Sequence, residues 1–204
     1  REYYEKVISL NSEFIDTLVN HANLSMRENK IEEAKKKLDK ALSLSNSPEQ
    51  NEIINTGLAH FFQQTGEFEK SIEHFKIVKK INPYNLIADR DISVMHKYIS
   101  NDDDHLVEME NKLKKTANKT LIKRLSFALA KAHEDLKNYE TSFDYLRKAN
   151  QIADKEINYK LSDDEKLFSN IKNFFKNFND KNILLKSKRK IIFIVGMPRS
   201  GTTL

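Results

Sequence analysis

The sequence predicts an all-α protein built from stacked helix–turn–helix pairs. Three observations support this prediction: a recurring frame of small and aromatic residues, a scarcity of turn residues, and a low apolar fraction. Only four glycines and three prolines occur among 204 residues, which is too few for a β-sandwich or a barrel. An apolar fraction of 39% suits a thin stack, in which neighbouring pairs bury one another's faces, better than one large core.

Composition also excludes several classes of protein. The absence of cysteine excludes a disulfide framework and a cysteine-ligated metal site. The longest apolar run, at 191–195, is far shorter than the roughly 18 residues of a membrane span, so we expect no transmembrane segment. We also expect a cytoplasmic location. The net charge is +5, but four Lys and Arg residues within 186–190 account for most of this excess. A broad basic face for nucleic acid is therefore not expected.

The recurring frame is clearest around Gly66. This turn residue is followed by Ser71 five positions later, by aromatic Phe75 after nine and by small Val78 after twelve. The same frame recurs twice elsewhere, as Asn29, Ala34, Leu38 and Ala41, and as Lys137, Ser142, Leu146 and Ala149. Its last position occurs at Val7, Ala41, Val78 and Ala149, at spacings of 34, 37 and 71. These spacings resemble one or two periods of the tetratricopeptide repeat, which is about 34 residues long.

The frame divides residues 1–157 into five units. A partial repeat occupies 1–12, and complete repeats are expected at about 15–48, 52–85 and 123–156. Where the first two complete repeats meet, Ser47 is a good N-cap residue, with Pro48 at the first helical position and Gln50 at the capping-box position. Residues 86–118 lack the small residues of the frame and are expected to form a degenerate helical pair.

The resemblance to tetratricopeptide repeats implies a concave face lined by the first helix of each pair. Mixed polar residues on that face suit a peptide, protein or glycan partner, and the alternative is ordinary solvent-facing surface. The candidate groove residues come from two first helices: Ile53, Thr56, His60, Gln63, Gln64, Arg124, Phe127, Lys131, Glu134 and Asp135.

Residues 158–189 are expected to form an amphipathic bridging helix followed by a basic linker. Ser162 and Glu165 have the spacing of a capping box at the start of this helix. Apolar residues then recur along one helical face, at Leu167, Phe168, Ile171, Phe174, Phe175 and Phe178. We expect this stripe to pack on the last repeat or on a following domain.

The pattern changes at residues 190–204. The β-branched run 191–195 reads as a buried strand, and a Gly-x-x-x-x-Gly loop follows it from Gly196 to Gly201. Such a loop turns backbone N–H groups towards an anion, and hydroxyl groups add further donors. A nucleoside triphosphatase loop needs Lys after its second Gly, but Thr202 stands there and the cation is Arg199.

This segment resembles the 5′-phosphosulfate loop of sulfotransferases, in particular of the tyrosylprotein branch. The resemblance implies a sulfuryl transfer from 3′-phosphoadenosine 5′-phosphosulfate (PAPS) to a hydroxyl or amine, without a metal. It makes Arg199 the candidate catalytic residue, in contact with the phosphosulfate bridge. The expected PAPS-binding residues are Gly196, Pro198, Arg199, Ser200, Gly201, Thr202 and Thr203.

Residues 190–204 are therefore expected to be the truncated start of an α/β sulfotransferase domain, and the chain a fragment that is inactive alone. The repeats would then recruit an acceptor or a partner. The main alternative is a tetratricopeptide scaffold for protein–protein interaction without catalysis. A divergent nucleotide kinase is a third possibility. The six histidines show no metal-ligand spacing, so no metal site is expected.

Overall fold

The computed structural model describes residues 1–10, 14–157 and 159–176. These residues form ten α-helices and no strand, so the all-α prediction is confirmed for the part of the chain that is described. The predicted strand and loop within 190–204 lie outside the described residues. The chain divides into two compact units, Arg1–Asn158 and Tyr159–Leu204, here called unit 1 and unit 2. The helices are α1 (Glu2–Leu10), α2 (Ile15–Arg27), α3 (Ile31–Leu44), α4 (Pro48–Thr65), α5 (Phe68–Ile81), α6 (Ala88–Met95), α7 (Asp104–Lys115), α8 (Lys119–Asp135), α9 (Tyr139–Glu156) and α10 (Leu161–Lys176).

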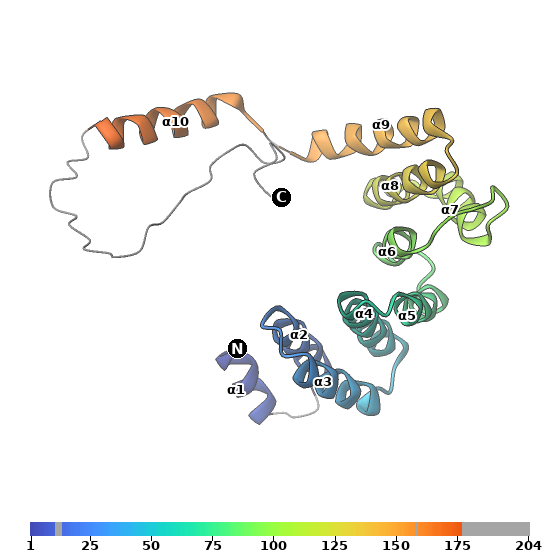
Figure 1. The fold of residues 1–204 in the computed structure, drawn as a ribbon. Coiled ribbons are helices and arrows are strands. Elements are labelled where there is room, and N and C mark those ends of the chain that lie inside the picture. Colours follow the sequence, from blue (N-terminus) through green and yellow to red (C-terminus); the bar gives the residue numbers. More distant parts are fainter. Residues whose placement is uncertain (11–13, 158, 177–204) are drawn as a thin grey trace, which may run out of the picture. The chain divides into compact units, whose positions relative to one another are not determined.

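Unit 1 is a stack of helices in chain order (Figure 1). Three antiparallel pairs, α2–α3, α4–α5 and α8–α9, pack closely along their lengths. In Figure 1, α4 and α6 lie on the left of the stack, and α5 and α7 lie on its right. We call the side formed by α2, α4, α6 and α8 the inner face. A helical repeat architecture is thus confirmed, with the first helices of the pairs on one side.

The turns within the three close pairs share one backbone conformation. Their turn residues Asn29, Gly66 and Lys137 all have positive φ angles, of 59°, 84° and 63°. In each turn the next backbone N–H donates to a carbonyl five residues earlier, at 2.8 Å in all three cases. This 6→1 bond defines a Schellman ending, in which a left-handed residue closes the helix. The frame deduced from the sequence therefore corresponds to a repeated local structure.

Two further contacts recur at equivalent frame positions. The Ser71 hydroxyl donates to the Ala59 carbonyl at 2.7 Å, and the Ser142 hydroxyl donates to the Ala130 carbonyl at the same distance. Both serines are buried, so each bond fixes the second helix of a pair against the first. Stacked rings accompany them: Phe62 with His74 at 5.3 Å between centroids, and His133 with Tyr145 at 5.5 Å.

The core of unit 1 consists of three clusters rather than one. The first joins α2, α3 and α4, the second joins α4, α5 and α6, and the third joins Tyr98 with α7 and α8. Close packing in the first depends on Gly57, because a Cβ there would lie 3.0 Å from both Leu38 Cδ2 and Val19 Cγ1. Large residues such as Phe75 and Ile54 are fully buried between helices.

The region 86–118 departs from the regular pattern. Helix α6 has eight residues and packs on α5 and α8, and α7 packs on α8 rather than alongside α6. The buried carboxylate of Asp89 occupies this joint, where it accepts hydrogen bonds from Lys112 at 2.5 Å and pairs with Lys79 at 2.8 Å. The ring of His105 lies 3.3 Å from Asp89 and 2.7 Å from the Tyr98 hydroxyl. A buried polar network thus connects α5, α6 and α7 at this joint.

The burial of Asp89 opposes its ionisation, but the hydrogen bonds from His105, Lys79 and Lys112 outweigh that effect and hold the pKa of this carboxyl well below its usual range. Burial lowers the pKa of the His105 imidazole, which favours its neutral form. Breaking one member of such a buried set leaves charge without compensation, which is costly.

Two predicted helix starts have different outcomes. Ser47 caps α4 as expected, because its hydroxyl accepts the Gln50 N–H at 3.2 Å with Pro48 as the first helical residue. The Gln50 side chain reaches back to the N–H of Asn46 at 3.0 Å, one residue before the N-cap. The capping box predicted at Ser162 is wrong, since α10 begins at Leu161 and Ser162 lies inside the helix.

Candidate binding face

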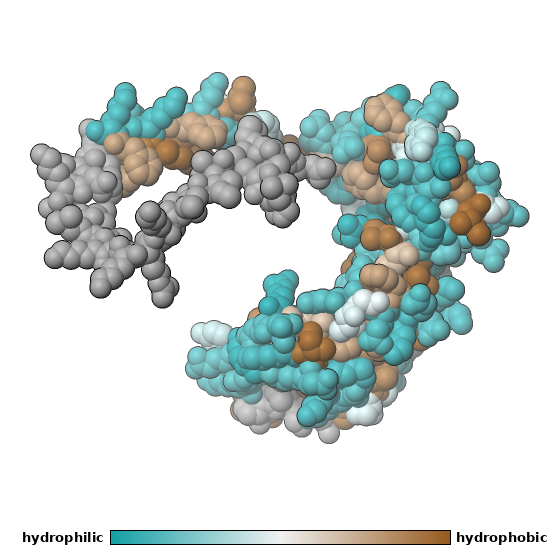
Figure 2. All heavy atoms as spheres, viewed as in Figure 1, coloured by the Kyte–Doolittle hydropathy of each residue, from teal (hydrophilic) through white to brown (hydrophobic). Residues whose placement is uncertain are grey.

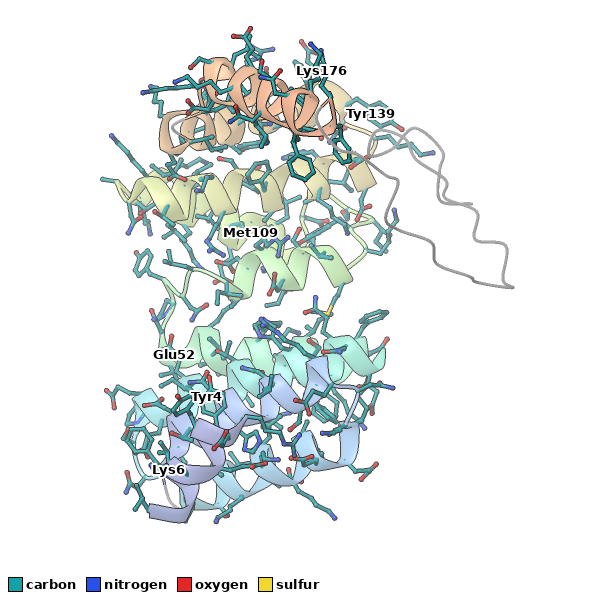
Figure 3. The ribbon with its side chains drawn as sticks, turned by 90° about the vertical axis from the view of Figure 1, so that its left-hand side faces the viewer. Tyr4, Lys6, Glu52, Met109, Tyr139 and Lys176 are labelled. Atoms are coloured by element: carbon teal, nitrogen blue, oxygen red, sulfur yellow. The ribbon has the colours of Figure 1, made fainter. Side chains whose placement is uncertain are left out.

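The groove residues predicted on α4 lie on the inner face of unit 1. Ile53 is 40% exposed, and the others on α4 are half-buried or exposed. Several are already hydrogen-bonded within the fold: the Thr56 hydroxyl donates to the Glu52 carbonyl, and the Gln64 side chain donates to the Met26 carbonyl of α2 at 3.4 Å. Figure 3 looks onto this side of unit 1, with Glu52 labelled.

The groove residues predicted on α8 divide into a cavity lining and an ion-paired end. Phe127 and Lys131 line a cavity. The Lys131 ammonium also donates to Asp135 at 2.6 Å. Asp135 further accepts from Lys97 at 2.8 Å and from the Tyr98 backbone N–H at 3.1 Å. Although partial burial opposes ionisation, the hydrogen bonds from Lys131 and Lys97 lower the pKa of Asp135 to about 2.

The cavity lies between α6 and α8 and has a volume of about 330 Å³. Its lining combines apolar side chains with cationic ones, contributed by both helices: Arg90, Ser93, Val94, Phe127, Ala128 and Lys131. Val94 is 54% exposed, which leaves apolar surface open to solvent at this point. Cavities of about this size accept single side chains or small ligands.

Four of these lining residues were not predicted from the sequence: Arg90, Ser93 and Val94 on α6, and Ala128 on α8. On α6 the frame of small residues fails and gives no register for a first helix. An apolar–polar pattern with Ile92 and Val94 on either side of Ser93 is the only local signal, and it does not fix which side chain faces the groove.

The orientation of α6 relative to α8 follows from two hydrogen bonds. The Ser93 hydroxyl donates to the Ala128 carbonyl at 2.9 Å, and the Lys131 ammonium donates to the His96 carbonyl. Each partner on α8 lies 35 positions after its partner on the α6 side. The two helices therefore run parallel, and Arg90 lies opposite the turn of α8 that contains Arg124.

A short chain of polar contacts joins α4 to α6 on the same face. Asp91 is 5% exposed, and its carboxylate lies 3.2 Å from His60 Nε2. The same carboxylate accepts from the guanidinium of Arg90 at 2.9 Å. The predicted groove residue His60 is thus connected to the cavity through Asp91.

A second and larger cavity, of about 530 Å³, lies between α5 and α7. Several of its charged lining groups already neutralise one another. Lys79 pairs with Asp89 and with Glu108 at 2.7 Å, and His96 pairs with Asp103 at 2.7 Å. These groups are therefore better explained as the joint between α5 and α7 than as a free binding site.

Helix α10 carries an apolar stripe on a largely exposed helix. None of its residues is buried, and Leu167, Phe168 and Ile171 are 54%, 61% and 43% exposed. Figure 2 shows hydrophilic and apolar sides along this helix. The expected packing of the stripe on the last repeat or on a following domain stays a prediction.

Other candidates concern metals, membranes and the anion loop. Within the described residues, no group of three or more His, Asp or Glu side chains is arranged to hold a metal ion. No helix among the residues described is long and apolar enough to cross a membrane. Arg199 and the other predicted PAPS-binding residues lie outside the described part of the chain.

Comparison with known proteins identifies the repeat. Residues 124–156, which contain most of α8 and all of α9, match the sequence model of the tetratricopeptide repeat. A tetratricopeptide repeat is therefore present, as the resemblance implied. An uncharacterised protein of Aquifex aeolicus (strain VF5) is 31% identical over 153 residues, which cover 72% of this chain and 19% of that protein. The chain thus spans about a fifth of the length of this curated relative.

Solved structures with similar folds include two of MamA. The crystal structure of MamA matches 76% of this chain and 88% of its own with a TM-score of 0.54 and 17% identity. A second MamA crystal structure matches 78% of this chain and 83% of its own, with a TM-score of 0.48 and 18% identity. The first likeness, at this identity, shows a shared fold.

Proposed function

We propose that unit 1 is a protein-interaction scaffold whose inner face binds an extended segment of a partner protein. The observation that carries this proposal is the cavity between α6 and α8. It opens on the same side as the predicted groove residues and combines exposed apolar surface with cationic groups. The tetratricopeptide match at 124–156 supports it, because stacked helical repeats create extended binding surfaces.

The lining of the inner face is of the kind that protein segments use. Ile53, Val94 and Phe127 offer apolar area. The side chains of Gln63 and Gln64 offer amide donors and acceptors. Apolar contacts supply most of the binding free energy, and neighbouring polar groups select the sequence that is bound.

A displayed random-peptide library, selected on the whole protein, tests this function. The selected peptides are then measured by fluorescence anisotropy against two variants, Ile53→Asp on the inner face and Ile77→Asp on α5. Both isoleucines are 40% exposed, so the two variants add the same charge at equal exposure. We expect Ile53→Asp to weaken binding at least tenfold and Ile77→Asp to leave it unchanged. Equal effects of the two variants would contradict the proposal.

We propose a second function for the protein that carries residues 190–204, namely PAPS-dependent sulfuryl transfer to a hydroxyl or amine. The sequence Gly196-Met197-Pro198-Arg199-Ser200-Gly201-Thr202-Thr203 supports it, because glycines and hydroxyls at this spacing suit a phosphate cradle. In that role Arg199 stabilises charge on the leaving group, and the repeats recruit a peptide, protein or glycan acceptor.

Thermal unfolding of the full-length protein tests this second function. We expect 3′-phosphoadenosine 5′-phosphate to raise the Tm, Mg·ATP to leave it unchanged, and Arg199→Ala to reduce the shift. A ligand present at 100 times its Kd adds about 2.7 kcal/mol to the free energy of unfolding. A shift with Mg·ATP alone would instead support the nucleotide kinase, and no shift with either nucleotide would leave the scaffold as the only proposed function.

A further inference from the structure

Two arginines flank the cavity of the inner face at the same end. Arg90 lies one turn before Ser93 and Val94 on α6, and Arg124 lies one turn before Phe127 and Ala128 on α8. Because residues three and four apart share a helix face, each arginine belongs to the stripe that lines the cavity. Because α6 and α8 run parallel with an offset of 35 positions, the two stripes place both arginines at the N-terminal end of the cavity.

The positive charge at this end is incompletely neutralised. Among the described residues the Arg124 side chain has no hydrogen bond or ion pair, although the residue is half-buried. Arg90 has a 55% exposed side chain, and its ion pair is with its own neighbour Asp91, which also faces His60. Lys131, at the other end of the cavity, is by contrast paired with Asp135. The free cationic capacity is therefore concentrated at Arg90 and Arg124.

We propose that this site recognises an acidic peptide segment, in which a carboxylate bridges Arg90 and Arg124 while a nearby apolar side chain enters the cavity. This inference rests on the proposed scaffold function and names the chemistry of its partner. A carboxylate placed between the two guanidinium groups would gain charge-assisted hydrogen bonds from both. Val94 and Phe127 supply the apolar wall for the second side chain.

The spacing of the two features predicts the sequence that is bound. Three to four residues of helix advance by roughly 5 Å, which is the distance along α8 from Arg124 to Phe127 and Ala128. In an extended peptide, side chains on the same face are two residues apart and separated by about 6.6 Å. We therefore expect the motif apolar-x-acidic, in either chain direction, and not an apolar residue directly next to the acidic one.

A designed peptide tests this inference on the whole protein. The probe is fluorescein-labelled Gly-Ser-Glu-Ser-Leu-Ser-Glu-Ser-Gly, which carries the motif in both directions, and binding is followed by anisotropy at low ionic strength. We expect saturable binding with a Kd below about 1 mM, and an affinity that falls about tenfold when both Glu are replaced by Gln. A peptide with Leu directly next to Glu is expected to bind more weakly than the probe.

Protein variants assign the effect to the two arginines. Arg90→Ala and Arg124→Ala are each expected to raise the Kd about tenfold. Arg147→Ala is the matched control, because it removes the same charge from α9, away from the cavity. The side chain of Arg147 is 58% exposed, which is similar to that of Arg90. The double variant Arg90→Glu/Arg124→Glu is expected not to bind the probe. It is expected to bind a version of the peptide in which Lys replaces both Glu residues.

Several outcomes would overturn the inference. These are equal weakening by Arg147→Ala, no loss on replacing Glu by Gln, or no saturable binding of the probe. If a version of the probe with phosphoserine in place of Glu binds through both arginines and the Glu probe does not, the site recognises a phosphate and not a carboxylate. If library-selected peptides depend on Ile53 but not on Arg90 or Arg124, the scaffold function stands and this inference fails.

Discussion

Replacing Gly66 by Ala and Lys137 by Gly should change stability in opposite directions. Both positions close a helix pair in the left-handed region, with φ of 84° and 63°. A residue with a Cβ costs roughly 1–2 kcal/mol in that region. Glycine in turn gives the unfolded chain more freedom, worth about 0.4–1 kcal/mol. The two terms leave a net change of about 1 kcal/mol for each substitution.

The structure simplifies the interpretation at Gly66, because an added Cβ would meet no heavy atom within 4 Å. The predicted loss in Gly66→Ala therefore comes from the backbone alone. The Lys137→Gly variant is expected to be more stable than the parent protein. The stability of Asn29→Gly is expected to change less, since Asn tolerates the left-handed region better than Lys. Thermal unfolding followed by circular dichroism should show shifts of about 2–4 °C per kcal/mol.

One pattern of results would refute this reasoning. If Gly66→Ala melts with the parent protein and Lys137→Gly melts below it, the two turns do not share a left-handed residue. The Schellman closures, and with them the common frame of the three pairs, would then have to be abandoned.

Three further predictions concern the packing and the buried charges of unit 1. Ser71→Ala and Ser142→Ala should each lower the free energy of unfolding by about 1 kcal/mol in urea titrations, because each removes the same buried bond to a carbonyl; a loss at one position only would contradict their equivalence. Phe75→Ala should lower it by about 3–5 kcal/mol, because the ring is fully buried, whereas the 60% exposed Phe143, changed to Ala, should cost far less; similar losses for both would argue against this burial. Burial lowers the pKa of His105, so the unfolded chain binds a proton at higher pH than the folded one. The stability present above about pH 6.5 should therefore decline as the pH falls below that value. The variant His105→Gln should show a smaller decline when Tm is measured against pH.

The regular pairs could be predicted from the sequence because their residues act locally. Gly66, Ser71 and Phe75 recur at fixed offsets, and each offset corresponds to a turn, a helix–helix bond or a buried ring. Even Lys137, which is an unusual residue for a left-handed turn, is located by its neighbours in the frame. Local order of this kind is what a repeated sequence pattern records.

The joint around α6 could not be predicted, since it depends on distant partners. Asp89 and Lys112 are charged residues 23 positions apart, and in the sequence each resembles ordinary surface. Asp103 belongs to an acidic run that reads as a solvated turn, yet its carboxylate caps α7 by accepting the N–H groups of His105 and Leu106. The cavity residues Arg90 and Val94 were missed for the same reason, because no frame assigns a face to α6.

The position of α6 has a consequence for cooperativity. One side of this short helix belongs to the cluster with α4 and α5, and another side contacts α8, so α6 connects these two clusters. A ligand held between α6 and α8 would therefore couple the opening of the two clusters. Amide hydrogen exchange in α5 should then slow together with that in α8 when the ligand binds, while exchange in α2 and α3 changes little.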